Sequence, residues 1–332
     1  MTEIPDEYME QIKKEFAIMK ETDDLNANLS QVLAEVHSIF LKHGISKIIY
    51  PSEVMFGRKH FGNSMHINVD IKTRENVFVY APNLSEIIFD HYYPRPKSKK
   101  FFHFTTLDSA IKIMNAGHFR VYNLLKNYDF DEFRTFYKDH NLDGFSNSYS
   151  HDGDLYEEHI MKQTFSLCLT NDATLSKKQE NYLWQVFAAG NTGVKLELEI
   201  NSNHIDLREI FYKDNSISKN DLLLNELDIH FKSKYNRQFA LSKISKIGGF
   251  YLPSRYEIEN ETRFLIKEHT EDYDFNFIIH PVGNGIAYIE LPFNNQFGIF
   301  NIKHIHLGVS CDLALAHSEF SKLGFGNIIV NP

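Results

Sequence analysis

The sequence predicts a protein of the α+β class, and three observations support this. Apolar residues recur at helical spacing in several segments, they alternate with polar residues in others, and Gly or Pro separates many of these segments. Of the 332 residues, 42% are apolar, including 28 Phe and 17 Tyr. Such a chain can bury one large core or two ordinary ones.

The N-terminal part combines helical and strand patterns. Apolar residues recur at helical spacing over residues 12–19 and again over residues 29–40, which predicts two amphipathic helices. Gly44 is a common type of C-terminal stop for the second helix. Apolar and polar residues then alternate over 67–71, and the strand-like residues 77–80 follow a short polar connection, which predicts a hairpin.

Residues 94–100 interrupt these patterns with two prolines and four cations. We interpret this segment as a linker, and the alternative is a basic loop inside one domain. The linker predicts an N-terminal α+β accessory region over residues 1–97 and a second domain over residues 98–332.

The second part begins with a strand, a helix and another strand. Residues 101–105 form a short aromatic run that indicates a buried strand, and Thr106 is a favourable cap for a helix over residues 107–114. Gly117 ends this helix, and residues 119–122 indicate the next strand.

The remaining elements are predicted from the same patterns. Residues 124–160 show neither a helical nor a strand pattern, so we expect a long irregular loop there. The other predicted strands cover 165–170, 193–200, 256–267, 275–279, 286–291, 302–308 and 327–330, and the other predicted helices cover 182–189, 218–247 and 312–323.

The segment from Tyr256 to Ile266 carries the main candidate for a reaction centre. On a strand, Glu259, Glu261 and Arg263 would share one face, while the alternate residues fill the core. Two neighbouring carboxylates inside a fold raise the pKa of at least one of them unless a cation relieves the repulsion, as happens at reaction centres. The alternative is the solvated face of an edge strand.

Composition excludes several classes of protein. The formal charge is −9, and most of the acidic excess follows residue 100, which argues against duplex nucleic acid but leaves short single strands open. Two cysteines and no long apolar run indicate a cytoplasmic protein without membrane or metal partners. His304 and His306 alternate on a strand, and a structural role is preferred to metal binding because no third ligand is close in sequence.

Four matches, in this order, give residues 101–332 a resemblance to a bacterial domain of unknown function in the ADP-ribosyltransferase superfamily. They are the opening strand Phe102–Thr105 with its helix, the strand 165–167 leading to Trp184 and the turn at 190–194, the Glu259-x-Glu261-x-Arg263 segment, and the ending 305–308. The resemblance implies a split, bent β-sandwich that holds NAD in a cleft.

The resemblance also implies roles for individual residues. His103 would contact the nicotinamide ribose, Glu261 would be the catalytic carboxylate, and Glu259 would orient the acceptor. A hydrogen-bonded place in the core is the alternative for His103. Arg120 or Arg263 would neutralise the diphosphate, and Arg263 is alternatively a partner of Glu259. The other residues expected to bind NAD are Thr105 and one aromatic residue among Trp184, Phe187, Tyr182 and Tyr122.

The function that the resemblance implies is transfer of ADP-ribose from NAD, as substrate, to a macromolecule that is RNA, DNA or protein. Superfamily members of this kind act as toxins in toxin–antitoxin or phage-defence systems, so an antitoxin protein is an expected partner. Two other functions stay open at this point: a catalytically inactive module that binds a nucleotide or a partner, and an NAD glycohydrolase.

Overall fold

A computed structural model of the protein describes residues 29–46, 66–69, 77–80, 82–127, 130–140, 156–202, 204, 206–213, 222–235, 238–240, 244–270 and 273–332. Two compact units can be separated in it. The first contains residues 1–91 and 216–244, and the second contains residues 92–215 and 245–332. Residues 216–244, expected in the second domain, thus belong to the compact unit that contains the N-terminal residues.

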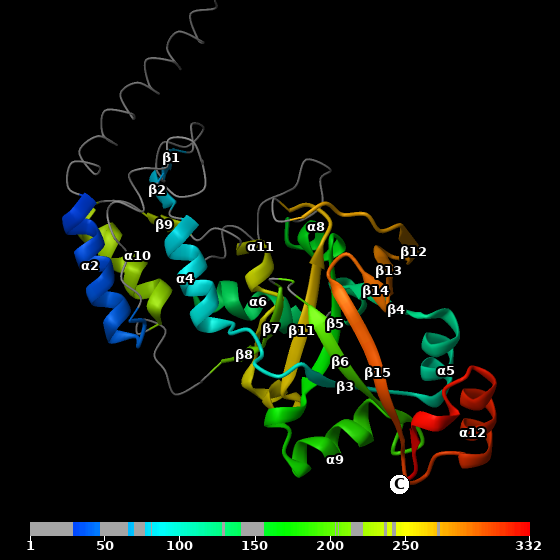
Figure 1. Ribbon diagram of the computed structural model, residues 1–332. Coiled ribbons are helices and arrows are strands. Elements are labelled where there is room, and N and C mark those ends of the chain that lie inside the picture. The colour runs from blue at the N-terminus through cyan, green and yellow to red at the C-terminus, as the bar shows by residue number, and fades with distance from the viewer. Residues whose placement is uncertain are drawn as a thin grey trace, which may run out of the picture. The chain divides into compact units, whose positions relative to one another are not determined.

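The first unit combines helices with a small sheet (Figure 1). Strands β1 and β2 form the predicted antiparallel hairpin, and β9 adds to β2 in parallel. Helix α10 packs on α2, which begins as predicted and ends just before Gly44. The elements are α2 (Leu29–Lys42), β1 (His66–Val69), β2 (Val77–Tyr80), α4 (Pro82–Tyr92), α10 (Leu223–Tyr235) and β9 (Gln238–Ala240). The helix predicted over residues 12–19 lies outside the described residues.

Polar contacts also join α10 to α2 and explain why a late segment belongs to the first unit. Glu35 accepts hydrogen bonds from Lys234 and from the hydroxyl of Tyr235, the latter at 2.7 Å. Burial raises the pKa of Glu35, but the hydrogen bonds from Lys234, Tyr235 and Gln31 outweigh that effect and lower it to about 2. The charged form of Glu35 is therefore stabilised by side chains at the end of α10, which holds α10 against α2.

The second unit is built on a mixed sheet of 11 strands, which confirms the predicted α+β class. Its main strand order is β12-β13-β4-β5-β3-β6-β15-β14; β11 pairs with β5 and β7, and β16 pairs with β15. Its elements are β3 (Lys100–Thr105), α5 (Leu107–Ala116), β4 (His118–Asn123), η1 (Leu124–Asn127), α6 (Phe130–Asp139), α8 (Tyr156–Lys162), β5 (Thr164–Asn171), η2 (Asp172–Thr174), α9 (Lys177–Val186), β6 (Val194–Ser202), β7 (Leu207–Glu209), β8 (Phe211–Tyr212), α11 (Ile244–Ile247), β10 (Tyr251–Leu252), η4 (Ser254–Glu259), β11 (Glu261–Lys267), β12 (Ile279–Gly283), β13 (Ile286–Pro292), β14 (Asn294–Asn295), β15 (Gly298–Leu307), α12 (Leu313–Lys322), η5 (Gly326–Ile328) and β16 (Ile329–Val330).

Two apolar clusters occupy the two faces of this sheet. The main core contains alternate residues of β4, β5, β6 and β11, and α5 and α12 cover it with Ala110, Met114, Ala316 and Phe320 (Figure 1). A smaller cluster on the other face joins Phe102 and Phe104 of β3 to Leu183 and Ala188 of the α9 segment. The strands therefore present a different set of side chains to each face.

The opening strand, helix and strand of this unit agree with the sequence prediction. Thr106 caps α5 by accepting a hydrogen bond from the backbone N–H of Ser109 at 3.1 Å. Gly117 ends the helix with φ of +70°, in the left-handed region that glycine adopts without strain. These local signals are strong because the capping residues satisfy backbone groups that a helix end leaves without partners.

Several sequence predictions are wrong. Residues 274–278 form no regular secondary structure, so the strand predicted over 275–279 is replaced by β12, which begins only at Ile279. The strand predicted over 327–330 is reduced to β16, because residues 326–328 form η5.

The expected loop over 124–160 contains α6 and α8, and Phe133, Phe136 and Tyr137 of α6 are buried at helical spacing. The single helix over 218–247 is replaced by α10, β9 and α11. The strand over 256–267 begins only at Glu261, because residues 254–259 form the 3₁₀ helix η4 and Asn260 takes a left-handed φ of +45°.

Two of the glycine motifs in the resemblance pack against each other. The N–H of Gly308 donates a hydrogen bond of 3.0 Å to the carbonyl of Gly193. A Cβ atom at position 308 would lie 2.1 Å from the carbonyl oxygen of Asn191, which is backbone and cannot move aside cheaply. This contact explains why a glycine follows the last residue of β15.

We therefore expect Gly308→Ala to lower the free energy of unfolding by about 1–3 kcal/mol, because overpacking forces backbone shifts. Thermal unfolding of the two proteins measures the difference. Val309→Ala is the control, since Val309 is the next residue and is 76% exposed. An equal effect of the two substitutions would contradict the packing explanation.

Lys267, a partly buried lysine, ends β11 close to a buried ion pair. Lys246 and Asp206 form an ion pair of 2.8 Å with side chains 4% and 1% exposed. The pKa of Lys267 is lowered to about 8, mainly by burial and also by the charge of Lys246, while the charge of Asp206 acts in the opposite direction. The folded state therefore disfavours the protonated form of Lys267.

We expect Lys267→Met to raise the free energy of unfolding at pH 7 by about 2–3 kcal/mol. The folded pKa lies below the ordinary value of 10.5, so the cost of the charge is fully present below pH 8 and disappears as the pH rises toward 10.5. Denaturation at pH 7 and pH 10 measures the change, with Lys322→Met as an exposed control. A loss of stability in Lys267→Met at pH 7 would contradict this prediction.

Candidate functional site

The sheet of the second unit opens along one edge of β5. There, β4 pairs with Phe165 and Ser166, while β3 pairs with Thr170 and Asn171. Between them, Leu167–Leu169 have no strand partner on this edge among the described residues, although β11 pairs along the whole opposite edge. Beyond Phe102, β3 continues only beside β6. The sheet therefore separates into two parts at the middle of β5.

A cavity of about 400 Å³ lies at this separation. Phe102, Phe104, Leu167, Leu169 and Leu183 supply its apolar walls. Its polar lining comes from six elements and consists of His103, Arg120, Asn123, Lys126, Ser166, Thr170, Glu259, Glu261 and Arg263. Tyr122, Cys168, Leu124 and Phe187 complete the wall. A volume in this range and a mainly apolar wall with a few convergent polar groups are typical of small-molecule sites.

His103 bridges the separation between the two parts of the sheet. Its Nδ1 lies 3.1 Å from the carbonyl oxygen of Cys168, and its ring packs edge-on to Phe119 at 5.7 Å between centroids. A carbonyl only accepts, so the proton belongs on Nδ1 and the lone pair on Nε2. Burial lowers the pKa of His103, and the hydrogen bond to Cys168 opposes this only in part. The neutral ring therefore offers Nε2 as an acceptor at neutral pH.

Glu261 begins β11, and Arg263 holds its carboxylate on the same face of that strand. Arg263 donates from Nε to Oε1 at 2.6 Å and from Nη2 to Oε2 at 3.1 Å, and its Nη1 donates to the carbonyl of Gly249 at 2.7 Å. Both side chains are buried. A carboxylate oxygen can accept more than one hydrogen bond, so the pair orients Glu261 and leaves it acceptor capacity.

The start of β11 is fixed by a further contact. The backbone N–H of Glu261 donates to the hydroxyl of Tyr212 at 2.7 Å. Burial raises the pKa of Tyr212 well above its ordinary value, and the charge of Glu261 raises it further. The tyrosine therefore stays neutral and holds the backbone of the carboxylate-bearing residue in place.

Glu259 also lines the cavity, but from η4 rather than from the strand on which the sequence placed it. The left-handed turn at Asn260 separates it from Glu261, so alternation along a strand does not bring the two carboxylates together. The η4 segment packs on α9. Burial raises the pKa of Tyr182 on α9, and the charge of Glu259 adds to this effect.

Arg120 and Lys126 supply the exposed positive charge at the cavity. The guanidinium of Arg120 lies 5.0 Å from the ring centroid of Tyr288, and Lys126 Nζ lies 3.3 Å from that of Tyr122. Burial lowers the pKa of Lys126. The expected contact of Arg263 with a diphosphate is less favoured than that of Arg120, because Arg263 already binds Glu261.

The structure separates the aromatic candidates. Phe187, which is 42% exposed, and Tyr122 line the cavity. Trp184 instead packs edge-on to Phe104 at 5.4 Å between ring centroids, and Trp184, Tyr182 and Thr105 are not among the lining residues. Phe187 and Tyr122 are therefore the best placed to stack on a bound ring.

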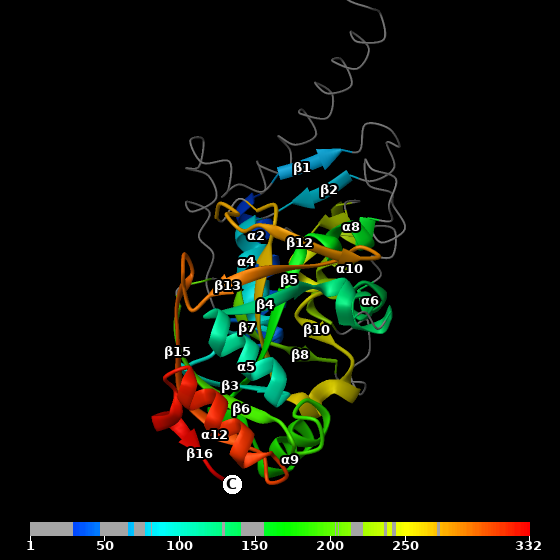
Figure 2. The same cartoon turned by 90° about the vertical axis from the view of Figure 1, so that its right-hand side faces the viewer.

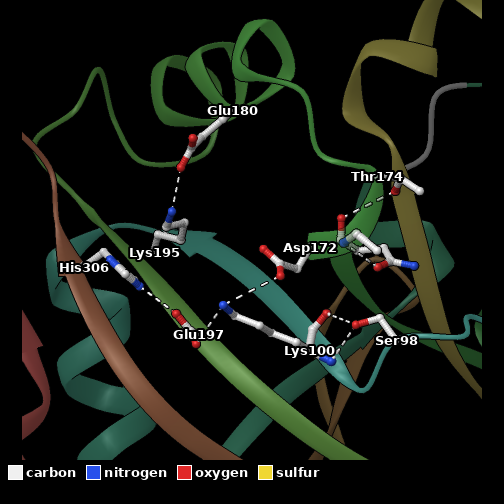
Figure 3. Close-up of polar contacts among 10 residues, drawn as sticks. Ser98, Lys100, Asp172, Thr174, Glu180, Lys195, Glu197 and His306 are labelled. Carbon is white, nitrogen blue, oxygen red and sulfur yellow. Dashed lines mark hydrogen bonds and ion pairs between the residues drawn. The ribbon is translucent and has the colours of Figure 1, made fainter.

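A network of charged residues lies on β3, β6 and β15 next to this site (Figure 3). Lys100 lies between Asp172 and Glu197, at 3.6 and 3.2 Å, and His306 Nε2 lies 2.9 Å from Glu197. Lys195 pairs with Glu180 at 2.5 Å and lies 4.5 Å from the ring centroid of Phe102. These contacts give each lysine a carboxylate partner, and burial lowers the pKa of His306, whose ring is hydrogen-bonded to Glu197. Such a contact is consistent with the structural role preferred from the sequence.

Some lining residues were not predicted. Ser166, Cys168 and Thr170 alternate with buried Phe165, Leu167 and Leu169, so the pattern of β5 already indicated a second face. For Asn123, the last residue of β4, and for Lys126 of the following η1, no motif gave a signal.

Within the described part of the chain, no three or more His, Cys, Asp or Glu residues group in a way that suits a metal ion. None of the helices described here combines the length and apolar character that a bilayer crossing requires. Comparisons with known protein families, with curated proteins and with solved structures each return no match for this chain.

Proposed function

We propose that the protein is an NAD-dependent ADP-ribosyltransferase that modifies a macromolecule, and that it acts as a bacterial toxin of a toxin–antitoxin or phage-defence system. One observation carries the enzymatic part of the proposal: His103, from the first strand of the second unit, and Glu261, from a late strand, line the same cavity. The toxin role comes only from the family resemblance.

The residues of the cavity fit the requirements of NAD. The apolar wall and the exposed ring of Phe187 suit the nicotinamide, whose positive charge an aromatic face attracts by about 0.5–2 kcal/mol. Arg120 and Lys126 suit the diphosphate. The neutral His103 suits a ribose hydroxyl, which can donate to Nε2.

The reaction breaks the bond between ribose and nicotinamide. The electron pair of this bond leaves with nicotinamide, which becomes neutral, while positive charge builds on the ribose. Glu261, held by Arg263, accepts a hydrogen bond from the ribose 2′-hydroxyl and stabilises this charge. Glu259 lies on a separate segment of the cavity wall, where it can accept the proton that the acceptor loses on bonding to the ribose carbon.

Incubation of the protein with NAD labelled in its adenine half tests the proposal. We expect release of nicotinamide and transfer of label to one macromolecular fraction among RNA, DNA and protein. Free labelled ADP-ribose as the only product would identify an NAD glycohydrolase instead. Intact NAD after incubation with all three fractions would contradict the enzymatic proposal.

The bidentate Glu261–Arg263 pair favours a second candidate, a catalytically inactive module that binds a nucleotide or a protein partner. In that case the pair would only stabilise the start of β11. Binding of NAD that is neither followed by cleavage nor changed by substitution of Glu261 would support this alternative.

A further inference from the structure

Three rings form a row across adjacent strands beside the cavity. The strand register places His280 of β12 opposite Tyr288 of β13, and Tyr288 opposite Tyr122 of β4. The ring centroids of the first pair lie 4.9 Å apart with planes inclined by 14°, and those of the second pair lie 5.4 Å apart. The three strands run side by side in Figure 2, and β12 begins the strand order of the sheet.

Two cations complete this row. Arg120 lies 5.0 Å from the ring of Tyr288, and Lys126 lies 3.3 Å from the ring of Tyr122. The two cations are exposed, and the three rings are partly exposed. We call His280, Tyr288, Tyr122, Arg120 and Lys126 the stacking row. It reaches the cavity, because Tyr122, Arg120 and Lys126 also line it.

The charge near the stacking row is mixed rather than strongly positive. Glu290 lies opposite Arg120 in the strand register, and the carboxylate of Glu290 lies 3.4 Å from His118 Nε2. The chain as a whole carries −9. A ligand that depends on many phosphate contacts is therefore disfavoured, whereas one that depends on stacking with one or two cations is suited.

We propose that the stacking row binds the bases of a single-stranded polynucleotide and leads that strand to the cavity as the acceptor of ADP-ribose. The assignment as acceptor rests on the proposed function, whereas the binding does not. Bases of a single strand stack on aromatic rings and guanidinium planes, and a row that is open at the edge strand can be extended by a base. In a duplex, the bases are already stacked on each other and do not reach such a row.

Fluorescence anisotropy with a short labelled oligoribonucleotide, and with the oligodeoxyribonucleotide of the same sequence, measures this binding without NAD. We expect micromolar or tighter binding of at least one single strand and loss of binding when its complement is annealed. The oligonucleotide that binds more tightly then shows whether the single strand is RNA or DNA. Two phosphate contacts predict a salt slope of about −1.4, at about 0.7 per phosphate for single strands.

Substitution of Tyr288, which does not line the cavity, assigns the binding to the stacking row. Tyr288 is the middle ring, so Tyr288→Leu removes the ring on which His280 stacks and interrupts the platform that a base would extend. We expect the affinity to fall about 5- to 150-fold, the range for loss of one base–aromatic contact. Tyr288→Phe keeps the ring and should retain the affinity, and thermal unfolding controls for the fold of both variants.

Equal affinity of Tyr288→Leu and wild type, equal binding of duplex and single strand, or no binding of either single strand would overturn the proposal. An equal loss of NAD affinity in Tyr288→Leu would assign the row to the dinucleotide and would also overturn it. Because these measurements contain no cleavage step, their failure is distinct from failure of the enzymatic proposal.

Discussion

Glu261→Gln is expected to lower the rate of nicotinamide release from NAD about 10²- to 10³-fold, the usual effect of removing one group that stabilises developing transition-state charge. The carboxylate is negative and stabilises positive charge on the ribose, whereas the amide is neutral. Arg263 orients this carboxylate in a buried position, where electrostatic effects are stronger than in water. The loss should therefore fall mainly on kcat rather than on binding of NAD.

Initial rates at saturating NAD, together with NAD affinity by calorimetry, measure this effect. Glu257→Gln is a matched control, because Glu257 lies on η4, is exposed, and does not line the cavity. We expect wild-type rates for this control. Equal NAD consumption by Glu261→Gln and wild type would show that Glu261 is not the catalytic carboxylate.

Arg263→Met is expected to lower the free energy of unfolding by about 3–5 kcal/mol, the cost of breaking a buried ion pair from one side. The substitution removes two hydrogen bonds from the carboxylate of Glu261, which is only 7% exposed, and one from the carbonyl of Gly249. The charge of Glu261 is then left in a site from which water is largely excluded.

The double variant Glu261→Gln/Arg263→Met separates the structural role of Glu261 from its catalytic role. Because neither buried side chain is then charged, we expect most of the stability lost in Arg263→Met to return. Nicotinamide release should stay as low as in Glu261→Gln alone. Recovery of wild-type activity together with stability would mean that the pair is only structural and that another group is the catalytic carboxylate.

Much of the fold could be predicted where local signals agree with the tertiary structure. The strand, helix and strand that begin the second unit follow from an apolar run, a threonine cap and a glycine stop. The capping box at Ser176 and Gln179 is an equally local signal, which places the start of α9 earlier than the predicted residue 182.

The errors arose where long-range packing decides the structure. Residues 218–247 look like one helix in sequence, but β9 pairs with β2, which is more than 150 residues earlier. Sequence patterns contain no information on such a partner. The boundary between η4 and β11 was also missed, because Glu259 and Glu261 alternate as in a strand while Asn260 makes a left-handed turn between them.

The sequence indicated some of the residues that line the cavity, but not the reason why they meet. His103 was selected by its position on the first strand, and alternation places it on the core side of β3 with Phe101. It reaches the cavity because β3 and β4 leave the middle of β5 without a partner on one edge among the described strands. That opening depends on how several strands share β5, which no single segment of the sequence specifies.

A crystal structure with a non-hydrolysable NAD analogue would show whether His103 and Glu261 hold the nicotinamide ribose of NAD in one cavity. We predict ribose hydroxyls within hydrogen-bonding distance of Glu261 and of His103 Nε2. An analogue bound elsewhere on the protein, with no contact to Glu261 or His103, would exclude this arrangement.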